Sequence, residues 1–384
     1  MDERVGLGTI AREWGRIGVV GFGGPPAHIL LLRRLCVERR GWLGAAEFED
    51  GIAATNLLPG PASTQLAIFT AWRLRGPAGA LVGGVSFIAP GLALILLLSA
   101  LFLAGDPPHW VLGAAAGAGA AVPAVALQAA TALVPASRQR AGGGAGRLRW
   151  YGYLLAGALA ALLTGPWLVL LLVATGITEI AVRRSGDGGP GRPGGLLPLL
   201  LPAASAVGGL GALAWVAFKV GALSYGGGFV IIPLMQHDAV QRYHWMTDAQ
   251  FLNAVALGQV TPGPVVQTVA VVGYASAGVA GGLLASAVAF APSFLFVLFG
   301  AAHFDRLRAD GRVQDFLTGA GPAVIGAIAG SAIPLGLALH AWWQAGVLTL
   351  ALLWLLALRR GVVPCLLAAG ALGALAVTAG LPLP

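Results

Sequence analysis

"VTPGPVVQ" (residues 260–267) and "LLPGPAST" (57–64) each place a Pro-Gly-Pro triplet inside a strongly apolar part of the chain. Proline lacks the amide hydrogen that a helix needs, and its ring clashes with the preceding turn, so each triplet interrupts a helix. Non-helical backbone is tolerated at membrane depth only where protein buries it or where it lines a water-filled cavity. The two triplets therefore predict a pair of helix breaks with a function inside a membrane.

The composition predicts a membrane protein. Hydrophobic residues make up 57% of the 384 residues and charged residues only 10%, with a mean hydropathy of +0.82. A soluble domain carries roughly 25% charged residues. We therefore expect an all-α polytopic membrane protein. The apolar runs long enough to cross about 30 Å of hydrocarbon include residues 78–103, 111–135, 279–302, 319–339 and 341–358.

The net charge of +8 does not indicate a nucleic-acid partner. Basic residues in the short loops of a membrane protein usually mark its cytoplasmic side, and no aromatic residues interleave with them here. Cys36 and Cys365 lie in unrelated contexts, and the six histidines show no paired spacing. Neither a disulfide framework nor a metal site is predicted. We expect no cofactor, and the N-terminus does not read as a removable signal peptide.

The chain is an internal duplication. An offset of 203 positions aligns "GVVGFGGPP" (18–26) with "GALSYGGGF" (221–229), and it also aligns the two Pro-Gly-Pro triplets. We predict two homologous halves with a Gly- and Pro-rich cytoplasmic linker between them. The predicted domains are an N-terminal transporter repeat at 1–182, the linker at 183–196 and a C-terminal transporter repeat at 197–384.

The basic loops predict that the halves point in opposite directions. In the first half, the loops at 33–40 and 73–75 are rich in arginine, whereas the loop at 102–110 contains none. In the second half the loop at 236–245 is nearly neutral, and the loop at 303–312 is basic. If basic loops face the cytoplasm, the halves form an inverted-topology repeat, which recurs in transporters.

The same loops bear on the breaks. Residues 47–72 lie between two basic loops, although a simple span would place those loops on opposite sides of the membrane. A re-entrant hairpin that turns at Pro59-Gly60-Pro61 would return to the side from which it entered. We expect such a broken or re-entrant helix in each half. The alternative is a full span with a kink at the triplet.

A helix break creates a new helix N-terminus, whose free amides and positive dipole end attract anions. Hydroxyl and amide side chains flank each break and can orient an oxyanion. The glycine clusters could converge backbone amides on the anion, although close helix packing is the alternative interpretation. The residues that we expect to bind substrate are Gly23, Gly24, Asn56, Pro59, Gly60, Pro61, Ser63, Thr64, Gln65, Lys219, Ser224, Tyr225, Gly226, Gly227, Gly228, Gln259, Pro262, Gly263, Pro264 and Gln267.

Lys219 is the only lysine in the chain, and its repeat mate is Arg16. A lysine can lose its proton when it is desolvated, whereas an arginine essentially cannot. We expect these residues to form a buried pair of cations that attracts a dianion and couples charge or protons to transport. The alternative is a charge that snorkels from a helix end to the interface. Five acidic residues lie near predicted segment ends, and most of them are expected to be solvated or to cap helices: Glu47, Glu49, Asp50, Asp238 and Asp248.

These motifs resemble the chromate ion transporter family, specifically its long-chain members with two fused homologous domains. Each half carries a K/R-x-G-x-x-x-[FY]-G-G opening, a later Trp and a Pro-Gly-Pro break. The most specific stretches are "FKVGALSYGGGFVIIPLM" (218–235) and "FLNAVALGQVTPGPVVQTVAVVGY" (251–274). The resemblance implies an inner-membrane exporter that removes chromate which has entered by sulfate uptake. The first half departs from the pattern at Pro25, which replaces the third glycine.

We therefore expect a multi-pass protein of the bacterial inner membrane that exports chromate, and that also binds sulfate, at paired half-helix N-termini. A secondary carrier for another small anion such as sulfate is the alternative, because tetrahedral dianions present nearly the same hydrogen-bonding surface. An intramembrane enzyme is a further alternative, although the triplets hold hydroxyls and amides rather than a nucleophile with its base. The sequence does not decide between a monomer and a homodimer.

Overall fold

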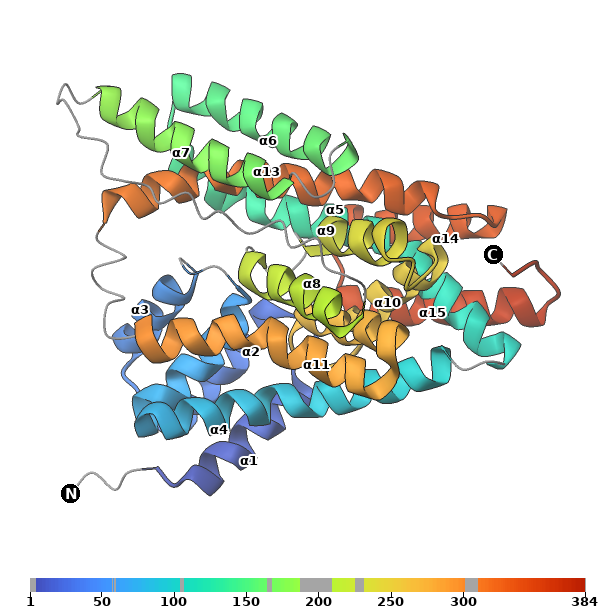
Figure 1. Ribbon diagram of the computed structural model, residues 1–384, viewed down its shortest axis with the longest axis horizontal. Coiled ribbons are helices and arrows are strands. Elements are labelled where there is room, and N and C mark those ends of the chain that lie inside the picture. Colours follow the sequence, from blue (N-terminus) through green and yellow to red (C-terminus); the bar gives the residue numbers. More distant parts are fainter. Residues whose placement is uncertain are drawn as a thin grey trace.

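The computed structural model describes residues 5–56, 58, 60–103, 107–163, 168–186, 209–224, 231–300 and 310–383. Within these ranges the regular structure is helical and no strand occurs (Figure 1). Among the described residues, four helices are long and apolar enough to cross a membrane by their length and composition. The prediction of an all-helical, polytopic membrane protein is confirmed.

The same series of helices occurs twice along the chain, and this repetition follows the sequence duplication. In the first half the elements are α1 (Leu7–Val20), α2 (Pro25–Arg33), η1 (Arg34–Arg39), α3 (Ala45–Thr55), α4 (Ala62–Phe102), α5 (His109–Ala141), α6 (Ala145–Leu163) and α7 (Leu168–Gly186). In the second half they are α8 (Leu210–Leu223), α9 (Ile231–Gln236), η3 (His237–Arg242), α10 (Asp248–Val260), η4 (Val265–Gln267), α11 (Thr268–Gly300), α13 (Gly311–Leu337), α14 (Trp342–Leu352), η6 (Leu353–Ala357) and α15 (Val362–Thr378).

Local sequence explains where several helices begin. Gly24 has a φ of 72° and precedes α2, whose first two positions are prolines that need no amide partner. Thr247 caps α10 in a capping box with Gln250. The matched segments η1 and η3 are both π-helical. The two halves therefore share local irregularities as well as helix lengths.

Both α4 and α11 reverse direction within their length. Gly76 and Gly278 each have a φ of 61°, directly after a non-helical residue. The segments on either side of each turn lie against each other: a Cβ built on Gly273 would lie 2.8 Å from the Cβ of Ala285. Residues twelve positions apart in a straight helix are separated by about 18 Å. The parts after the turns, 77–102 and 279–300, still exceed the roughly 20 residues that span a bilayer core.

The first Pro-Gly-Pro triplet separates α3 from α4. Glu47, in the first turn of α3, forms an ion pair with Arg73, which lies just before the reversal of α4. A Cβ on Gly51 would lie 2.7 Å from the ring of Phe69. A straight span would hold residues 47 and 73 about 39 Å apart. The helices on the two sides of the triplet therefore lie next to each other.

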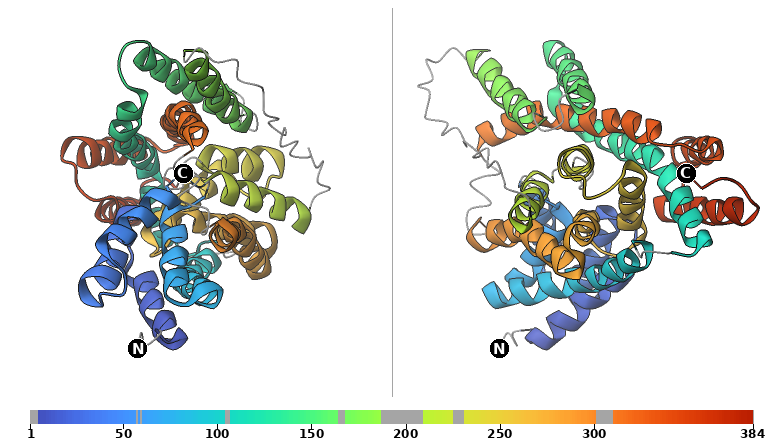
Figure 2. Two further views of the ribbon diagram at one scale, coloured as in Figure 1. Left: turned by 90° about the vertical axis from the view of Figure 1, so that its left-hand side faces the viewer. Right: turned by 45° about the vertical axis from the view of Figure 1, so that its right-hand side comes forward.

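The two halves are interleaved. Helix α13 of the second half packs against α6 and α7 of the first, whereas α5 of the first packs against α14 and α15 of the second. Helices α5 and α13 also pack against each other and run in opposite directions (Figure 1). Two further views show the pairs α6–α7 and α14–α15 on different sides of the molecule (Figure 2). The last two helices of each half thus pack against a long helix of the other half.

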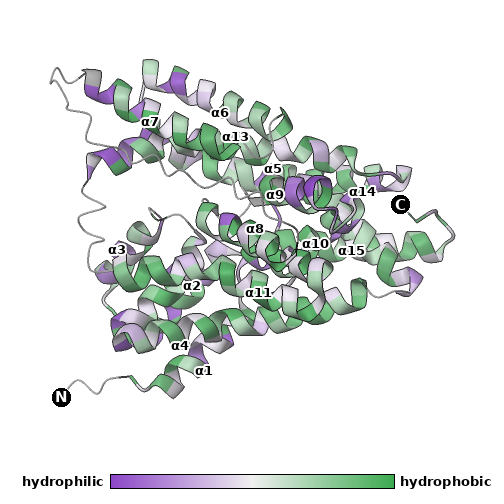
Figure 3. Ribbon diagram, viewed as in Figure 1, coloured by the Kyte–Doolittle hydropathy of each residue, from purple (hydrophilic) through white to green (hydrophobic). Residues whose placement is uncertain are grey.

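The hydropathy of the residues varies along the helices (Figure 3). Apolar residues line the lengths of α4, α11 and α13, and hydrophilic residues gather toward helix ends (Figure 3). The end of α7, the start of α13 and the region of α3 lie together at the left edge of this view. An apolar belt between polar ends is what a bilayer requires of a spanning protein.

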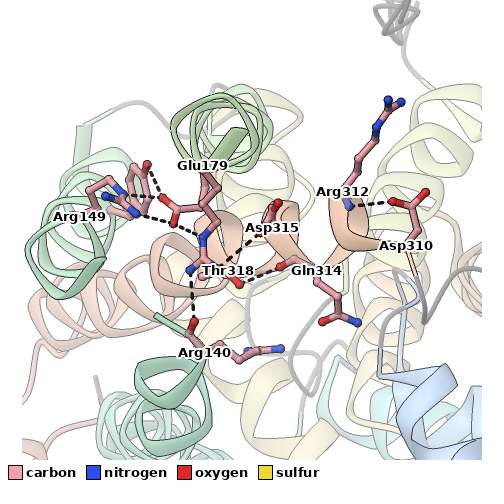
Figure 4. Close-up of polar contacts among 10 residues, drawn as sticks. Arg140, Arg149, Glu179, Asp310, Arg312, Gln314, Asp315 and Thr318 are labelled. Carbon is pink, nitrogen blue, oxygen red and sulfur yellow. Dashed lines mark hydrogen bonds and ion pairs between the residues drawn. The ribbon is translucent and has the colours of Figure 1, made fainter. Parts of the chain in front are cut away.

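A buried carboxylate ties α6, α7 and α13 together at their polar end (Figure 4). Glu179 is 2% exposed and accepts hydrogen bonds from Arg149 at 2.8 and 2.9 Å and from Arg183 at 2.7 Å. Arg183 also lies 3.5 Å from Asp315 of α13. Burial raises the pKa of Glu179, but the bonds from the two arginines outweigh it and lower the pKa to about 2.

We expect Glu179→Gln to destabilise the protein by about 2–3 kcal/mol at pH 7, because two arginines lose a buried countercharge. The folded-state pKa lies below the ordinary value of 4.5, so this contribution is present above pH 4.5 and is lost as the pH falls toward 2. Thermal unfolding of the detergent-solubilised variants measures it. Glu38→Gln is the matched control, since Glu38 is 56% exposed and lies 3.8 Å from its arginine. Equal stability of the two variants at pH 7 would contradict the prediction.

Asp238 is an exception among the acidic residues near segment ends. It is neither solvated nor a helix cap: it is 2% exposed and forms an ion pair with Lys219 of α8. Asp238 lies in the π-helical segment η3, whose wider turn changes the face on which each side chain falls. The pairing satisfies a charge that would otherwise be costly to bury.

Candidate functional site

The two Pro-Gly-Pro breaks contact the opposite halves at matched positions. A Cβ on Gly60 of the first break would lie 3.3 Å from the Oγ of Ser293 in α11. A Cβ on Gly91 of α4 would overlap the carbonyl oxygen of Pro262 and lie 2.5 Å from the Oε1 of Gln267 at the second break. Gly91 and Ser293 follow the matched prolines Pro90 and Pro292. Each break therefore rests on the long helix of the other half.

Two hydrogen bonds connect the second break to the first half, one to the glycine cluster and one to α4. The Gly263 N–H donates to the Gly21 carbonyl at 3.0 Å. The Gln267 Nε2 donates to the Ile88 carbonyl at 2.7 Å. Gly263 has a φ of 97°, a conformation that favours glycine. The segment after α1, the second break and the middle of α4 thus meet at one place.

His28 connects this junction to the first break. Its side chain is fully buried, with Nε2 2.9 Å from the Gly21 carbonyl and Nδ1 3.2 Å from the Oγ of Ser63. The ring packs edge-on against Phe87 of α4, with 5.0 Å between centroids. Gly21 is therefore shared: its carbonyl accepts from Gly263 and also contacts His28, which in turn contacts the first turn of α4.

Several polar atoms around the breaks are buried without a hydrogen-bond partner among the described residues. Such atoms are rare in folded proteins and mark places where a water, an ion or a ligand completes the bonding. Thr64 Oγ1, Gln259 Nε2 and Gln267 Oε1 lie within three residues of a triplet, and Ser293 Oγ lies at the described contact of the first break. Ser224 Oγ, at the C-terminal end of α8 and at the repeat position of Gly21, is likewise buried without a described partner.

The first break also presents backbone donors. Helix α4 begins at Ala62, and the amides of Thr64 and Gln65 donate to the Pro61 carbonyl. The first amides of a helix have no partner within it, so those of Ala62 and Ser63 face the break. Free amides, hydroxyls and the positive end of a helix dipole together form an environment suited to an anion.

Comparison with known proteins identifies the family to which these features belong. The family model described as "Chromate transporter" matches residues 8–178 and 211–376, which is most of the chain in two regions. The chain belongs to the chromate transporter family. The resemblance predicted from the motifs is confirmed.

Curated members of the chromate transporter family align over most of their length. A chromate transport protein of Cupriavidus metallidurans is 33% identical over 329 residues, which cover 83% of this chain and 80% of the relative. A probable chromate transport protein of Synechococcus elongatus is 29% identical over 86% of this chain and 84% of its own. A chromate transport protein of Pseudomonas aeruginosa is 30% identical over 83% and 79%. No solved structure gives a significant match.

The residues predicted to bind substrate in this chromate transporter family member fall into four groups. Gly24, Gly60, Gln65, Gly263 and Gln267 lie at contacts around the breaks, and a Cβ built on Gly24 would lie 3.8 Å from Val265. Pro61, Ser63, Thr64, Gln259, Pro262 and Pro264 are buried next to or within the triplets, Ser224 is buried at the end of α8, and Gly23 is exposed. Pro59 and the cluster Tyr225, Gly226, Gly227 and Gly228 lie outside the described residues.

The remaining predicted residues lie elsewhere. Arg16 is exposed on α1, and Asn56 is exposed at the C-terminal end of α3. Lys219, 13% exposed, pairs with Asp238 of η3, and Arg242 lies 4.0 Å from the same carboxylate. The cations expected as a buried pair thus differ: Arg16 is exposed, whereas Lys219 has an acidic partner.

Three contact residues were not predicted from the sequence of this chromate transporter family member. His28 lies four residues after Gly24, so a histidine within an apolar stretch was the available signal. Gly91 and Ser293 lie in the aligned segments "FIAPG" (87–91) and "FAPSF" (290–294). The alignment located these segments, but only the fold shows that each faces the break of the other half.

Proposed function

We propose that this protein exports chromate, or a similar tetrahedral oxyanion, across the bacterial inner membrane. The observation that carries the proposal is the set of unpartnered polar atoms buried where the two breaks contact opposite halves. An anion with four oxygens is a suitable ligand for hydroxyl and amide donors that converge from several directions. Membership of the chromate transporter family, with relatives named for chromate transport, supports this substrate class.

The proposed architecture is an inverted-topology repeat of two domains, 1–182 and 197–384, joined by a cytoplasmic linker. Each half contributes a re-entrant pair of short helices, α3 with the first part of α4, and α10 with the first part of α11. The interleaved packing and the opposite directions of α5 and α13 support this arrangement. Transporters of this type bind substrate at broken helices near the midplane and move one repeat against the other.

The donors at the site fit an oxyanion in chemical type. The hydroxyls of Thr64, Ser224 and Ser293 and the amide nitrogen of Gln259 can donate to it, and so can the backbone of Ala62 and Ser63. The Gln267 Oε1 can only accept, so it suits a bound water or a protonated oxygen of the anion. A site of uncharged donors holds a dianion weakly enough to release it, which transport requires.

The membrane potential favours export. Moving two negative charges out of a negative cytoplasm gains roughly 4–5 kcal/mol per 100 mV. This energy supports an outward concentration ratio of about three decades at that potential. Export therefore needs no proton gradient on energetic grounds, and potential alone can drive it.

We further propose that Lys219 serves charge or proton coupling through its ion pair with Asp238. Lys219→Arg keeps the cation but removes its ability to lose a proton. We expect Lys219→Arg to retain transport while its pH dependence flattens. Lys219→Met leaves buried Asp238 with only the more distant Arg242, 4.0 Å away, so we expect transport to fall by more than tenfold. An unchanged pH profile in Lys219→Arg would count against coupling and leave a structural ion pair.

The deciding experiment is chromate uptake into everted membrane vesicles under an inside-positive potential, with and without excess sulfate. Saturable uptake above that of vesicles lacking the protein supports the proposal, and sulfate competition shows that the site recognises charge and shape. Saturable sulfate uptake without chromate uptake favours the carrier for another anion. Uptake equal to that of empty vesicles at every potential contradicts the chromate assignment.

A further inference from the structure

The described contacts fix the tautomer of the neutral His28 ring. A carbonyl oxygen only accepts hydrogen bonds, so the His28 Nε2 that lies 2.9 Å from the Gly21 carbonyl carries a hydrogen. In the neutral ring, Nδ1 is then an acceptor, and the Ser63 hydroxyl 3.2 Å away must donate to it. The Ser63 O–H therefore points at the histidine and away from any ligand.

Protonation of His28 reverses this bond. Once Nδ1 carries a hydrogen, it becomes the donor and the Ser63 Oγ becomes the acceptor. The hydroxyl hydrogen of Ser63 is then free to turn toward another partner. Ser63 is 2% exposed and sits in the first turn of α4, next to Thr64, whose hydroxyl has no partner in the described residues.

We propose that His28 is a positioning residue that links proton uptake to anion binding by setting the direction of the Ser63 hydroxyl. The inference rests on the proposed oxyanion site at the breaks. Protonated His28 releases the Ser63 O–H to donate to an anion oxygen and adds a positive charge behind it. Neutral His28 withdraws that donor. The anion and the proton thereby bind together, with no covalent change.

The His28 ring has no charged partner among the described residues. Its partners there are Ser63, Phe87 and Gly21, which are all uncharged. Glu13 faces inward from α1, but it pairs with Arg40 at 2.9 Å and lies about 12 Å along the helix from Gly21. The charged residues on the elements packed around the ring are Arg12, Glu13, Arg16, Arg33, Arg34, Glu38, Arg39, Arg73 and Arg75.

The test measures sulfate binding to the purified full-length protein between pH 5.5 and 8.0 by calorimetry. Sulfate is the probe because it stays a dianion over this range, whereas chromate takes up a proton within it. We expect the wild-type Kd to rise with pH by up to tenfold per unit, as one linked proton requires. His28→Gln should bind sulfate with a Kd that is nearly independent of pH. Ser63→Ala should show a shallower slope than the wild type, because it keeps the charge of protonated His28 but lacks the hydroxyl. His237→Gln, which changes a half-buried histidine of η3 bonded to Gln241, should keep the wild-type slope.

The outcomes separate this inference from the proposed function. Sulfate binding whose pH slope survives in both His28→Gln and Ser63→Ala overturns the role of His28 and leaves the anion site in place. Absence of sulfate and chromate binding to the wild type at every pH overturns the anion site, and this inference with it. If His28→Gln does not fold, Ser63→Ala decides: a slope shallower than that of the wild type supports the role of the hydroxyl, and a slope equal to it overturns that role.

Discussion

Gly91→Leu should abolish oxyanion transport, with a loss of at least about 100-fold in vesicle uptake. A Cβ at this position would lie 2.5 Å from the Oε1 of Gln267 and would overlap the Pro262 carbonyl. The backbone carbonyl cannot move aside without displacing the second break, and overpacking of this kind usually costs 1–3 kcal/mol or more. The substitution disrupts a contact between the two halves. We therefore expect it to impair the relative movement of the repeats as well as the anion site.

The matched control is Gly346→Leu in α14. Gly346 is also a helical glycine, but a Cβ built there meets nothing within 4 Å. We expect this variant to transport at close to the wild-type rate. Comparable losses in the two variants would mean that leucine in any of these helices impairs the protein. The loss in Gly91→Leu could then not be attributed to its contact with the second break. Retained transport in Gly91→Leu would contradict the described contact.

Combined replacement Thr64→Val and Ser293→Ala should weaken oxyanion binding by at least 100-fold while the protein becomes no less stable. Each hydroxyl bonded to a charged ligand is worth about 1.5–3 kcal/mol, so two account for roughly 3–6 kcal/mol. Both hydroxyls are buried without partners in the described residues. Removing an unsatisfied buried polar group usually leaves stability unchanged or raises it. Opposite changes in binding and stability are the signature of a site kept for function.

Thr70→Val provides the control for this pair. Thr70 is as buried as Thr64 and lies in the same part of α4, but its hydroxyl donates to the Leu66 carbonyl at 2.8 Å. We expect Thr70→Val to keep its affinity for the oxyanion and to lose a little stability. Binding that survives in the double variant would show that these hydroxyls do not face the anion. Calorimetry with sulfate and thermal unfolding measure both quantities on one preparation.

Much of the fold could be predicted from the sequence because the strongest signals are physical extremes. A low charged fraction with long apolar runs permits few structures other than membrane helices. The duplication could be read because Trp42, Phe48 and the first triplet match Trp245, Phe251 and the second in register. The arginine-rich turn at 73–75 also indicated that the chain turns back, and the structure places a reversal at Gly76.

The parts that could not be predicted depend on contacts between distant segments. The exposure of Arg16 and the burial of Asp238 follow from which face of a helix meets its neighbour. No local pattern encodes that choice in a chain that is apolar on nearly every face. The neighbour of Gly91 lies in the other half, and only interleaved packing brings it there. His28 carried a signal, but its two hydrogen bonds needed the fold to be seen.

The interleaving of the halves also governs how the protein is made. The Gln267 amide and the Ile88 carbonyl are separated by 179 residues. The hydrogen bond between Gly263 and Gly21 joins residues that lie still farther apart in the sequence. When the first half leaves the ribosome, its break and Gly21 have no second half to contact. Contacts of such separation form late in folding, so the centre of this protein is completed last. We therefore expect a chain truncated before the second half to have no transport activity, rather than half of it. Such a chain also stays open to proteolysis by cellular quality control.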